Sequence, residues 1–455
     1  MPRRDSIIAK TALPLADRLR GTSSLEKARF MEHSQWWNRS RINEFRFKKL
    51  RSLVLHAYEN VPYYRRIFKE IGLDPSNIKD IEDISKIPIL SKRDVRKCKT
   101  ELLASGFEKS RMRTGRTGGS TGEPIQFYND TNTLSWAWGA MYRYYQWTGM
   151  KLGEGRIDLG GGSLGGYLSK GGMKQALSKI LRKIQRNPFF PSFELDAEMA
   201  SQICNLSNKH KIRVLRGYPS GIYLLAKYAE TKNLDFSHLK IVQSTSELLF
   251  PQQRTTIEKH LTADVYDQYG SAEILSIASQ CDKKQAYHVF EEHVIVEDPS
   301  LLGKTSDRVS AIITDLDNYA MPFIRYELGD ILNYKDASCS CERSLLKIAK
   351  VEGRTHDFLT STEGRPVPGE FIPHLYQKVV GFDQYFVHQV STHEIEVRIV
   401  KNEYFHQKEI DALIRQMQEI LGADMKIVFQ EVEEIEKSPT GKIFFIKSEV
   451  EPTFD

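Results

Sequence analysis

The strongest constraint on the fold is an alternation of strand-like and helical runs in the middle of the chain. Each β-rich run is followed by a helical pattern, and each is short enough for one strand or one helix. This alternation is typical of βαβ units, in which helices cover a mainly parallel sheet. In chain order we expect a strand at 212–216, a helix at 222–230, a strand at 239–244, a helix at 251–260 and a strand at 265–268.

The regions on either side of this α/β segment have different patterns. Residues 31–103 show helical spacing interrupted by turns, and Pro62 is placed to end one helix and begin the next. Residues 289–297 and 309–315 are β-rich. Nearer the C-terminus a compact α+β pattern is expected, with strands at 385–390, 395–400 and 425–430 and a helix at 408–421.

The change of pattern near Arg354 predicts two domains in a chain of 455 residues, which is long enough for more than one core. We expect a large N-terminal α/β domain over residues 1–353, with mainly parallel sheets plus a β-rich portion. A small, mobile α+β domain is expected over residues 354–455. Both a monomer and a homodimer fit the sequence.

Charge and hydropathy restrict the partners and the location. A net charge of +6 is too small at this length to indicate nucleic acid, but it suits an anionic small molecule. The sequence has neither a run of about 18 apolar residues nor a secretory leader pattern, so a cytoplasmic protein is expected. A basic run is expected on a solvated helix face, with a peripheral membrane contact as the alternative. It consists of Lys179, Arg182, Lys183 and Arg186.

Two loops carry residues suited to a nucleotide. In Thr117–Gly118–Gly119–Ser120–Thr121–Gly122–Glu123–Pro124, small residues and hydroxyls let backbone N–H groups wrap a phosphate, although the ending of a Walker A loop is missing. Tyr269–Gly270–Ser271–Ala272–Glu273 follows a strand-like run and offers an aromatic ring, a tight turn and an acid. These groups suit base stacking and a Mg²⁺ ion. Each loop, taken alone, also fits an ordinary surface turn.

Three later segments add polar groups. In Arg325–Tyr326–Glu327–Leu328–Gly329–Asp330, the final aspartate can accept both hydroxyls of a ribose. Gly353–Arg354–Thr355–His356–Asp357 lies at the expected domain boundary. Lys437–Ser438–Pro439–Thr440–Gly441–Lys442 places a lysine where it can stabilise a carboxylate that attacks a phosphate.

The order and separation of these five motifs resemble those of the adenylate-forming superfamily, which includes acyl-CoA synthetases, luciferases and peptide-synthetase adenylation domains. The closer resemblance is to the phenylacetate–CoA ligase group and its relatives in capsule and surface-polysaccharide biosynthesis. Residues 61–65, 87–92 and 216–220 also fit this group, and the resemblance runs from about residue 45 to the C-terminus. It implies an ATP-dependent ligase that converts a small carboxylic acid to an acyl-adenylate, releases pyrophosphate and transfers the acyl group to CoA.

The resemblance also implies a role for each motif residue. Thr117, Gly118, Gly119, Ser120, Thr121 and Gly122 match the phosphate loop, with Glu123 in place of the usual lysine. The family's residues around the adenine correspond here to Ser246, Glu247, Tyr269, Gly270 and Ser271. Glu273 matches the Mg²⁺ ligand, and Asp330 with Arg354 matches the ribose site. Thr355, His356 and Asp357 match the hinge, and Lys442 the catalytic lysine of the adenylation step.

The cysteines suggest a second metal. Their number, five, is odd, and a disulfide framework is not expected. Cys339 and Cys341 have C-x-C spacing, and Cys281 and His288 precede them. Some members of the phenylacetate–CoA ligase group look similar here and carry a structural Zn²⁺. Three thiolates and one imidazole form a closed tetrahedral set, so zinc is expected, with buried cysteines and a hydrogen-bonded histidine as the alternative.

Other functions were weighed. Residues 160–165 contain G-x-G-x-x-G, but the basic region that follows lacks the acid a dinucleotide site needs; this loop is an alternative lining for the acyl pocket. A non-catalytic relative is disfavoured because Glu273, Asp330 and Lys442 are all present. Two alternatives concern the acceptor: acyl transfer to an amine in surface-polysaccharide biosynthesis, and adenylylation of a cofactor hydroxyl.

Overall fold

The computed structural model describes most of the chain. The described residues are 2–107, 112–116, 125–160, 186–192, 195–354, 358–364, 366–368, 371–376, 379, 381–436 and 446–450.

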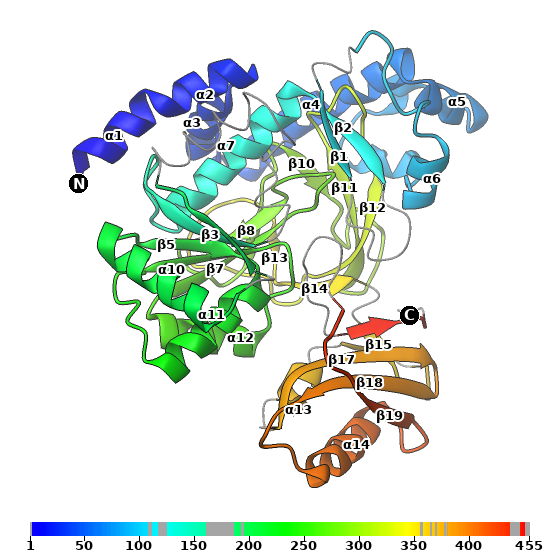
Figure 1. Ribbon diagram of the computed structural model, residues 1–455. Helices are drawn as coiled ribbons and strands as arrows, with labels where there is room; N and C mark the ends of the chain where they lie inside the picture. Colours follow the sequence, from blue (N-terminus) through cyan, green and yellow to red (C-terminus); the bar gives the residue numbers. More distant parts are fainter. Residues whose placement is uncertain are drawn as a thin grey trace.

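The N-terminal part is helical and forms one side of the large domain (Figure 1). Val61 is the N-cap of the helix that Pro62 begins, so the predicted break at this proline is confirmed. A capping box between Ser91 and Asp94 starts the last helix of the region. The helices are α1 (Pro2–Lys10), α2 (Ala12–Arg20), α3 (Ser24–Ser34), α4 (Arg39–Asn60), α5 (Pro62–Glu70) and α6 (Lys92–Lys97), with short 3₁₀ turns at Pro75–Asn77 and Glu82–Lys86.

The central element is a large sheet in which five adjacent described strands run parallel and three more continue it antiparallel. The predicted strands fall on β5, β6 and β7, and the predicted helices on α11 and α12. The order across the sheet is β13 (Lys347–Ile348), β9 (Tyr287–Val289), β8 (Ala278–Gln280), β7 (Asp264–Tyr269), β6 (Ile241–Thr245), β5 (Val214–Gly217), β3 (Arg156–Gly160) and β4 (Phe189–Pro191).

Helices cover both faces of this sheet because alternate residues of its strands are apolar on each side. Leu215 and Val242 pack with helices α10 (Ala197–His210), α11 (Pro219–Lys232) and α12 (Pro251–Leu261). Their neighbours Val214 and Ile241 pack on the other face with the aromatic helix α7 (Thr131–Trp147) and with α3. The aromatic residues of α7 are therefore largely core residues.

A second, antiparallel sheet and a short hairpin complete the large domain. Residues 289–297, expected as one β-rich portion, belong to both sheets, because β9 ends at Val289 and β10 begins at Val294 in the second one. The second sheet has the order β10 (Val294–Val296), β11 (Arg308–Asp315), β12 (Tyr326–Asn333) and β14 (Lys350–Arg354), and the hairpin pairs β1 (Arg113–Arg116) with β2 (Gln126–Asn129).

The C-terminal part has its own core and forms a separate β-rich unit, placed below the large domain in Figure 1. The predicted α/β class with a smaller α+β unit is confirmed, while the boundary at residue 354 stays a prediction. The four-stranded sheet has the order β19 (Lys426–Glu431), β18 (Glu394–Lys401), β17 (Phe382–Ser391) and β20 (Ile446–Ser448), next to α13 (Phe371–Tyr376), α14 (Gln407–Leu421) and the pair β15 (Phe358–Thr360) and β16 (Pro366–Pro368).

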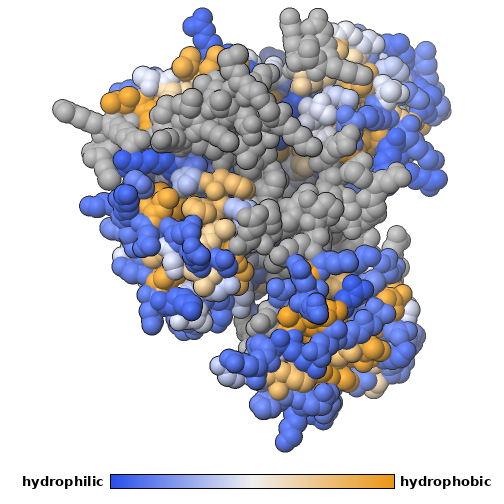
Figure 2. Space-filling model, viewed as in Figure 1, coloured by the Kyte–Doolittle hydropathy of each residue, from blue (hydrophilic) through white to orange (hydrophobic). Residues whose placement is uncertain are grey.

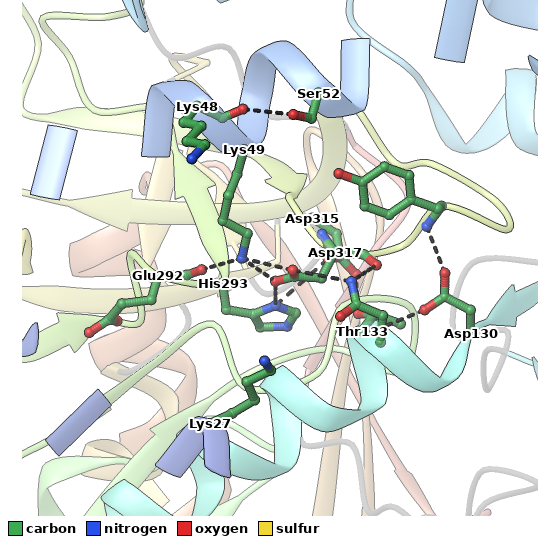
Figure 3. A network of polar contacts seen from close by, with 12 residues as sticks. Lys27, Lys48, Lys49, Ser52, Asp130, Thr133, Glu292, His293, Asp315 and Asp317 are labelled. Carbon is green, nitrogen blue, oxygen red and sulfur yellow. Dashed lines mark hydrogen bonds and ion pairs between the residues drawn. The ribbon is translucent and has the colours of Figure 1, made fainter. Parts of the chain in front are cut away.

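A buried polar network ties the N-terminal helices to the sheets (Figure 3). The ammonium of Lys49 on α4 lies 2.7 Å from a carboxylate oxygen of Asp317 and donates to the Glu292 carbonyl at 2.6 Å. His293 Nδ1 lies 2.9 Å from the other Asp317 oxygen. Burial lowers the pKa of His293, but the neighbouring carboxylates Asp315 and Asp317 outweigh it and raise the pKa above its usual value. The network therefore holds opposite charges together at the junction of two layers.

Replacing Lys49 should destabilise the large domain. The Lys49→Met change leaves the buried Asp317 carboxylate without its ammonium partner, which costs about 3–5 kcal/mol in comparable buried pairs. The measurement is urea unfolding followed by tryptophan fluorescence. Lys48→Met is the matched control, since the neighbouring Lys48 side chain is exposed. Equal effects of the two changes would contradict the role of Lys49.

Candidate functional site

The end of β7 and the middle of β12 bring predicted nucleotide residues together. Tyr269 is the last residue of β7, and its hydroxyl donates to the Asp330 carboxylate at 2.8 Å. Asp330 is the backbone partner of Arg354 across β12 and β14, next to an irregularity in the pairing. Residues far apart in sequence thus meet at the carboxyl edge of the parallel strands, where α/β proteins generally bind their ligands.

The turn after Tyr269 is compact and leads to Glu273. Ser271 and Ile274 exchange two hydrogen bonds: the Ser271 backbone N–H donates to the Ile274 carbonyl at 3.0 Å, and the Ile274 N–H donates to Ser271 Oγ at 2.9 Å. A Cβ at Gly270 would lie 3.0 Å from the backbone nitrogen of Ser276. Any larger residue at this position would need the neighbouring backbone to shift by a few tenths of an ångström, so glycine suits the tight turn that carries Glu273.

Glu273 is nearly buried and held by two elements. Its Oε1 accepts a hydrogen bond from the Tyr326 hydroxyl at 2.9 Å, and its backbone carbonyl accepts one from Asn129 at 3.2 Å. Tyr326 and Asp330 both lie on β12, on either side of Gly329, where a φ of 80° and shifts in the strand pairing mark an irregularity. A carboxylate oriented in this way by a second residue is typical of metal ligands.

Ser246 and Glu247 lie one strand away from Tyr269. They follow β6, whose last residue Thr245 pairs with Gln268 of β7. The Glu247 carboxylate accepts from the backbone N–H of Ser220 in the first turn of α11, at 3.1 Å. The structure thus places both residues at the expected edge, with Glu247 turned toward the start of a helix, a position that favours negative charge.

Several predicted site residues lie outside the described residues: Thr117, Gly118, Gly119, Ser120, Thr121, Gly122, Thr355, His356, Asp357, Lys442 and the side chain of Arg354. The two ends of the first loop are nevertheless located, because Arg116 on β1 pairs with Gln126 on β2. Of the basic run predicted on a helix, only Arg186 is described.

The four predicted zinc ligands converge. The ligand atoms of Cys281, His288, Cys339 and Cys341 all lie within 4.8 Å of one another. The Cys281 and Cys339 sulfurs are 3.6 Å apart, and Cys341 Sγ is 3.4 Å from His288 Nε2. Zinc–sulfur bonds of about 2.3 Å and zinc–nitrogen bonds of about 2.0 Å in a tetrahedron separate the ligand atoms by roughly 3.5–3.8 Å. The observed spacing therefore fits a tetrahedral cation.

The protonation of this set also suits a cation. Burial lowers the pKa of His288 to about 3, helped by Lys347 and Arg343, so the imidazole is neutral and able to ligate. Burial opposes ionisation of Cys341, but hydrogen bonds from Arg343 outweigh it and lower the pKa of that thiol. Cys281 follows β8, about three residues or roughly 10 Å back from the carboxyl edge. A closed set behind the edge indicates a structural rather than a catalytic metal.

Sequence reasoning missed two kinds of residue. Tyr326 was part of a motif but had no role, because its contact with Glu273 joins residues 53 positions apart and leaves no local pattern. The second kind is the group His293, Asp315 and Asp317, whose donor atoms also lie close enough for a metal. Because Lys49 already contacts Asp317, this group is an ion-paired network. No local sequence pattern indicates it.

The groups at the carboxyl edge have chemistry that suits a nucleotide. Asp330 provides acceptors for a diol, Tyr269 an aromatic face and Glu273 a ligand for a divalent cation. Each of these groups is fixed by a hydrogen bond. Such a preorganised set is suited to a phosphorylated sugar.

Comparison with known proteins gives this geometry a context. Residues 359–449 match the family described as the CapK C-terminal domain. The chain is 24% identical to the phenylacetate–coenzyme A ligase of Thermus thermophilus over 334 residues, or 70% of this chain and 72% of the relative. It is 22% identical to protein CapK of Staphylococcus aureus over 403 residues, or 88% of this chain and 87% of the relative. The resemblance to the phenylacetate–CoA ligase group is confirmed.

Solved structures agree on the fold. A 2-hydroxyisobutyryl-CoA ligase in the postadenylation state, in complex with 2-HIB-AMP, aligns with a TM-score of 0.72 at 19% identity, covering 92% of this chain and 93% of that one. The same ligase in its thioesterification state, with 2-HIB-AMP and CoA, aligns with a TM-score of 0.61. The chain therefore has the fold of the adenylate-forming CoA ligases.

We expect purified protein to contain about one zinc per chain, because the four ligand atoms form a closed set. Cys341→Ser should lower the zinc content and the Tm, since bound metal contributes to folding free energy. Mass spectrometry of the metal content and thermal unfolding are the measurements. Cys98→Ser is the control, as Cys98 lies outside the set. Zinc far below one per chain in protein purified without chelators would contradict the site.

Proposed function

We propose that this chain, a homologue of phenylacetate–coenzyme A ligases with the fold of adenylate-forming CoA ligases, activates a carboxylic acid with ATP and passes the acyl group to CoA. The observation that carries the proposal is the convergence of Tyr269 and Asp330 on one edge, with Glu273 in the turn between β7 and β8. The relatives named as ligases and the structures with bound acyl-AMP support it.

In the proposed first step a carboxylate oxygen of the acid attacks the α-phosphorus of ATP. The bond from that phosphorus to the bridging oxygen breaks, and pyrophosphate leaves. Asp330 holds the ribose hydroxyls and Tyr269 lies against the adenine, so the α-phosphate is presented at a fixed place. When bound at Glu273, Mg²⁺ supplies positive charge that offsets the repulsion between two anions.

In the proposed second step the sulfur of CoA attacks the acyl carbon and AMP leaves. Two reactions at one site call for two arrangements of the small domain, with Lys442 serving only the first. The higher TM-score against the postadenylation state than against the thioesterification state of one ligase supports an arrangement here that is nearer the former.

An amine acceptor is the second candidate, and the observation that favours it is the match to CapK. Protein CapK and the phenylacetate–coenzyme A ligase of Aromatoleum evansii each align over 88% of this chain, so the match of the small domain to the CapK C-terminal family is what points to the second candidate. In this alternative the acyl-adenylate is the same, but its acyl carbon forms an amide. The nucleotide site serves both candidates equally.

The test is hydroxylamine trapping of the acyl-adenylate with ATP, Mg²⁺ and a panel of aryl, fatty and amino acids. We expect a hydroxamate from one acid class, and in the presence of CoA a thioester in its place. Lys442→Ala should abolish the hydroxamate while leaving the consumption of pre-made acyl-adenylate intact, because the lysine acts on the attacking carboxylate. An amide in place of the thioester would select the second candidate. If the protein binds ATP but yields no product from any acid, both candidate functions are contradicted. An adenylylated cofactor would instead identify a cofactor hydroxyl as the acceptor.

Asp330→Ala should weaken AMP binding roughly 10–100-fold, the range expected for hydrogen bonds to a charged acceptor. The variant should also lose discrimination between AMP and its 2′,3′-dideoxy analogue, since the carboxylate is what reads the two hydroxyls. Calorimetry with both nucleotides measures this. Glu327→Ala is the control, because it removes an acid from the same strand three residues before Asp330. Unchanged discrimination in Asp330→Ala would contradict the assignment.

A further inference from the structure

Helices α1 and α2 form one nearly continuous rod on the outside of the large domain (Figure 1). The helical hydrogen bonds continue through their junction: the Thr11 N–H donates to the Ile7 carbonyl at 2.9 Å, and the Leu15 N–H donates to the Thr11 carbonyl at 3.1 Å. From Ile7 to Leu19 the rod is about 18 Å long, at the rise of an α-helix. Sequence reasoning did not predict these helices.

One face of the rod is attached to the protein. Ile8 and Ala16 are 6% and 7% exposed. The Asp17 carboxylate accepts from the Thr22 hydroxyl at 2.7 Å and from the Leu25 N–H at 2.9 Å. A Cβ at Gly153 would lie 2.4 Å from the Asp5 carbonyl, so the rod packs closely on that turn. The rod is therefore held in one orientation.

The opposite face combines large apolar and basic side chains. Ile7, Leu15 and Leu19 are 59%, 55% and 64% exposed, which is unusual for three aliphatic residues on one stripe. The upper left of Figure 2, where the rod lies, shows hydrophobic and hydrophilic atoms side by side. No acid is among the exposed residues of the described segment 5–20, which are Ile7, Lys10, Thr11, Pro14, Leu15, Arg18, Leu19 and Arg20.

We propose that this face docks the protein on an anionic lipid bilayer. Aliphatic side chains that alternate with long basic ones along an exposed helix are typical of helices that lie in the membrane interface. Lys10 and Arg18 can reach lipid headgroups while Ile7 and Leu15 enter the acyl boundary, because basic side chains extend past neighbouring apolar ones. Because no acid is among the exposed residues of the described segment 5–20, the positive charge of this face is complementary to an anionic surface.

The contact would be peripheral and reversible. Among the described residues, no helix is long and apolar enough to cross a membrane. The stripe is short, and an amphipathic helix alone anchors a protein weakly. The acid-activating edge is formed by β7 and β12, separate from α1 and α2, so docking and catalysis do not share residues.

The test is co-sedimentation of the untagged full chain with vesicles. We expect binding to phosphatidylcholine vesicles that contain phosphatidylglycerol, little binding to phosphatidylcholine alone, and loss of binding at high salt. Leu15→Glu with Leu19→Glu should lower the partition coefficient at least tenfold. Lys10→Gln with Arg18→Gln should lower it about 25-fold, since each basic residue near an anionic surface contributes about fivefold.

The matched control is Arg51→Gln with Leu55→Glu on α4, where Leu55 is 47% exposed outside the stripe. This variant should bind as well as the unaltered chain. No binding to anionic vesicles, or an equal loss in the control, would overturn the proposal. A stripe that instead joins two copies of this chain would appear in light scattering as a dimer that the Leu15→Glu, Leu19→Glu variant abolishes, and would overturn it as well.

Discussion

The contact between Lys49 and Asp317 is the constraint on which the arrangement of the large domain depends. It joins the longest N-terminal helix to the turn between β11 and β12 in the interior of the protein. Charges of opposite sign are costly to bury apart and tolerable only when paired closely, so the network permits few alternative placements of α4. β12 in turn presents Tyr326 and Asp330, so the position of the site follows from this junction.

The carboxyl edge and the Cys and His set of the large domain suit different kinds of ligand. At the carboxyl edge, hydrogen bonds hold polar groups in place: Asp330 is partly exposed, while Tyr269 and Glu273 are buried. At the Cys and His set behind it, four donor atoms face one another, and one thiol has its pKa shifted upward, to about 12 for Cys281, chiefly by burial. The first arrangement suits a ligand that comes and goes, and the second suits an ion that stays.

The sequence was informative where a feature is local. Neighbouring residues determine both the turn from Tyr269 to Glu273 and the start of a helix at Pro62, and both features are present in the structure. The Cys339 and Cys341 spacing, with Cys281, His288 and the resemblance to the ligase group, suggested a metal set. The pairing of β8 with β9 explains why His288 joins Cys281. The stretches 289–297 and 309–315 are β-rich as expected, but the division of 289–297 between two sheets was not predicted, because a break between sheets has no periodic signal.

Contacts between residues far apart in the sequence could not be predicted from the sequence. Lys49 and Asp317 are 268 residues apart, and nothing near either residue indicates the other. That separation has a consequence during synthesis. At about 5–20 residues per second, a ribosome needs roughly 13–54 s to make the chain from Lys49 to Asp317. For that interval the Lys49 ammonium lacks its partner, and the apolar side of α4 is covered only in part, by neighbouring elements such as α5. The nascent N-terminal helices must therefore remain protected, by transient contacts or by chaperones, until the second sheet emerges.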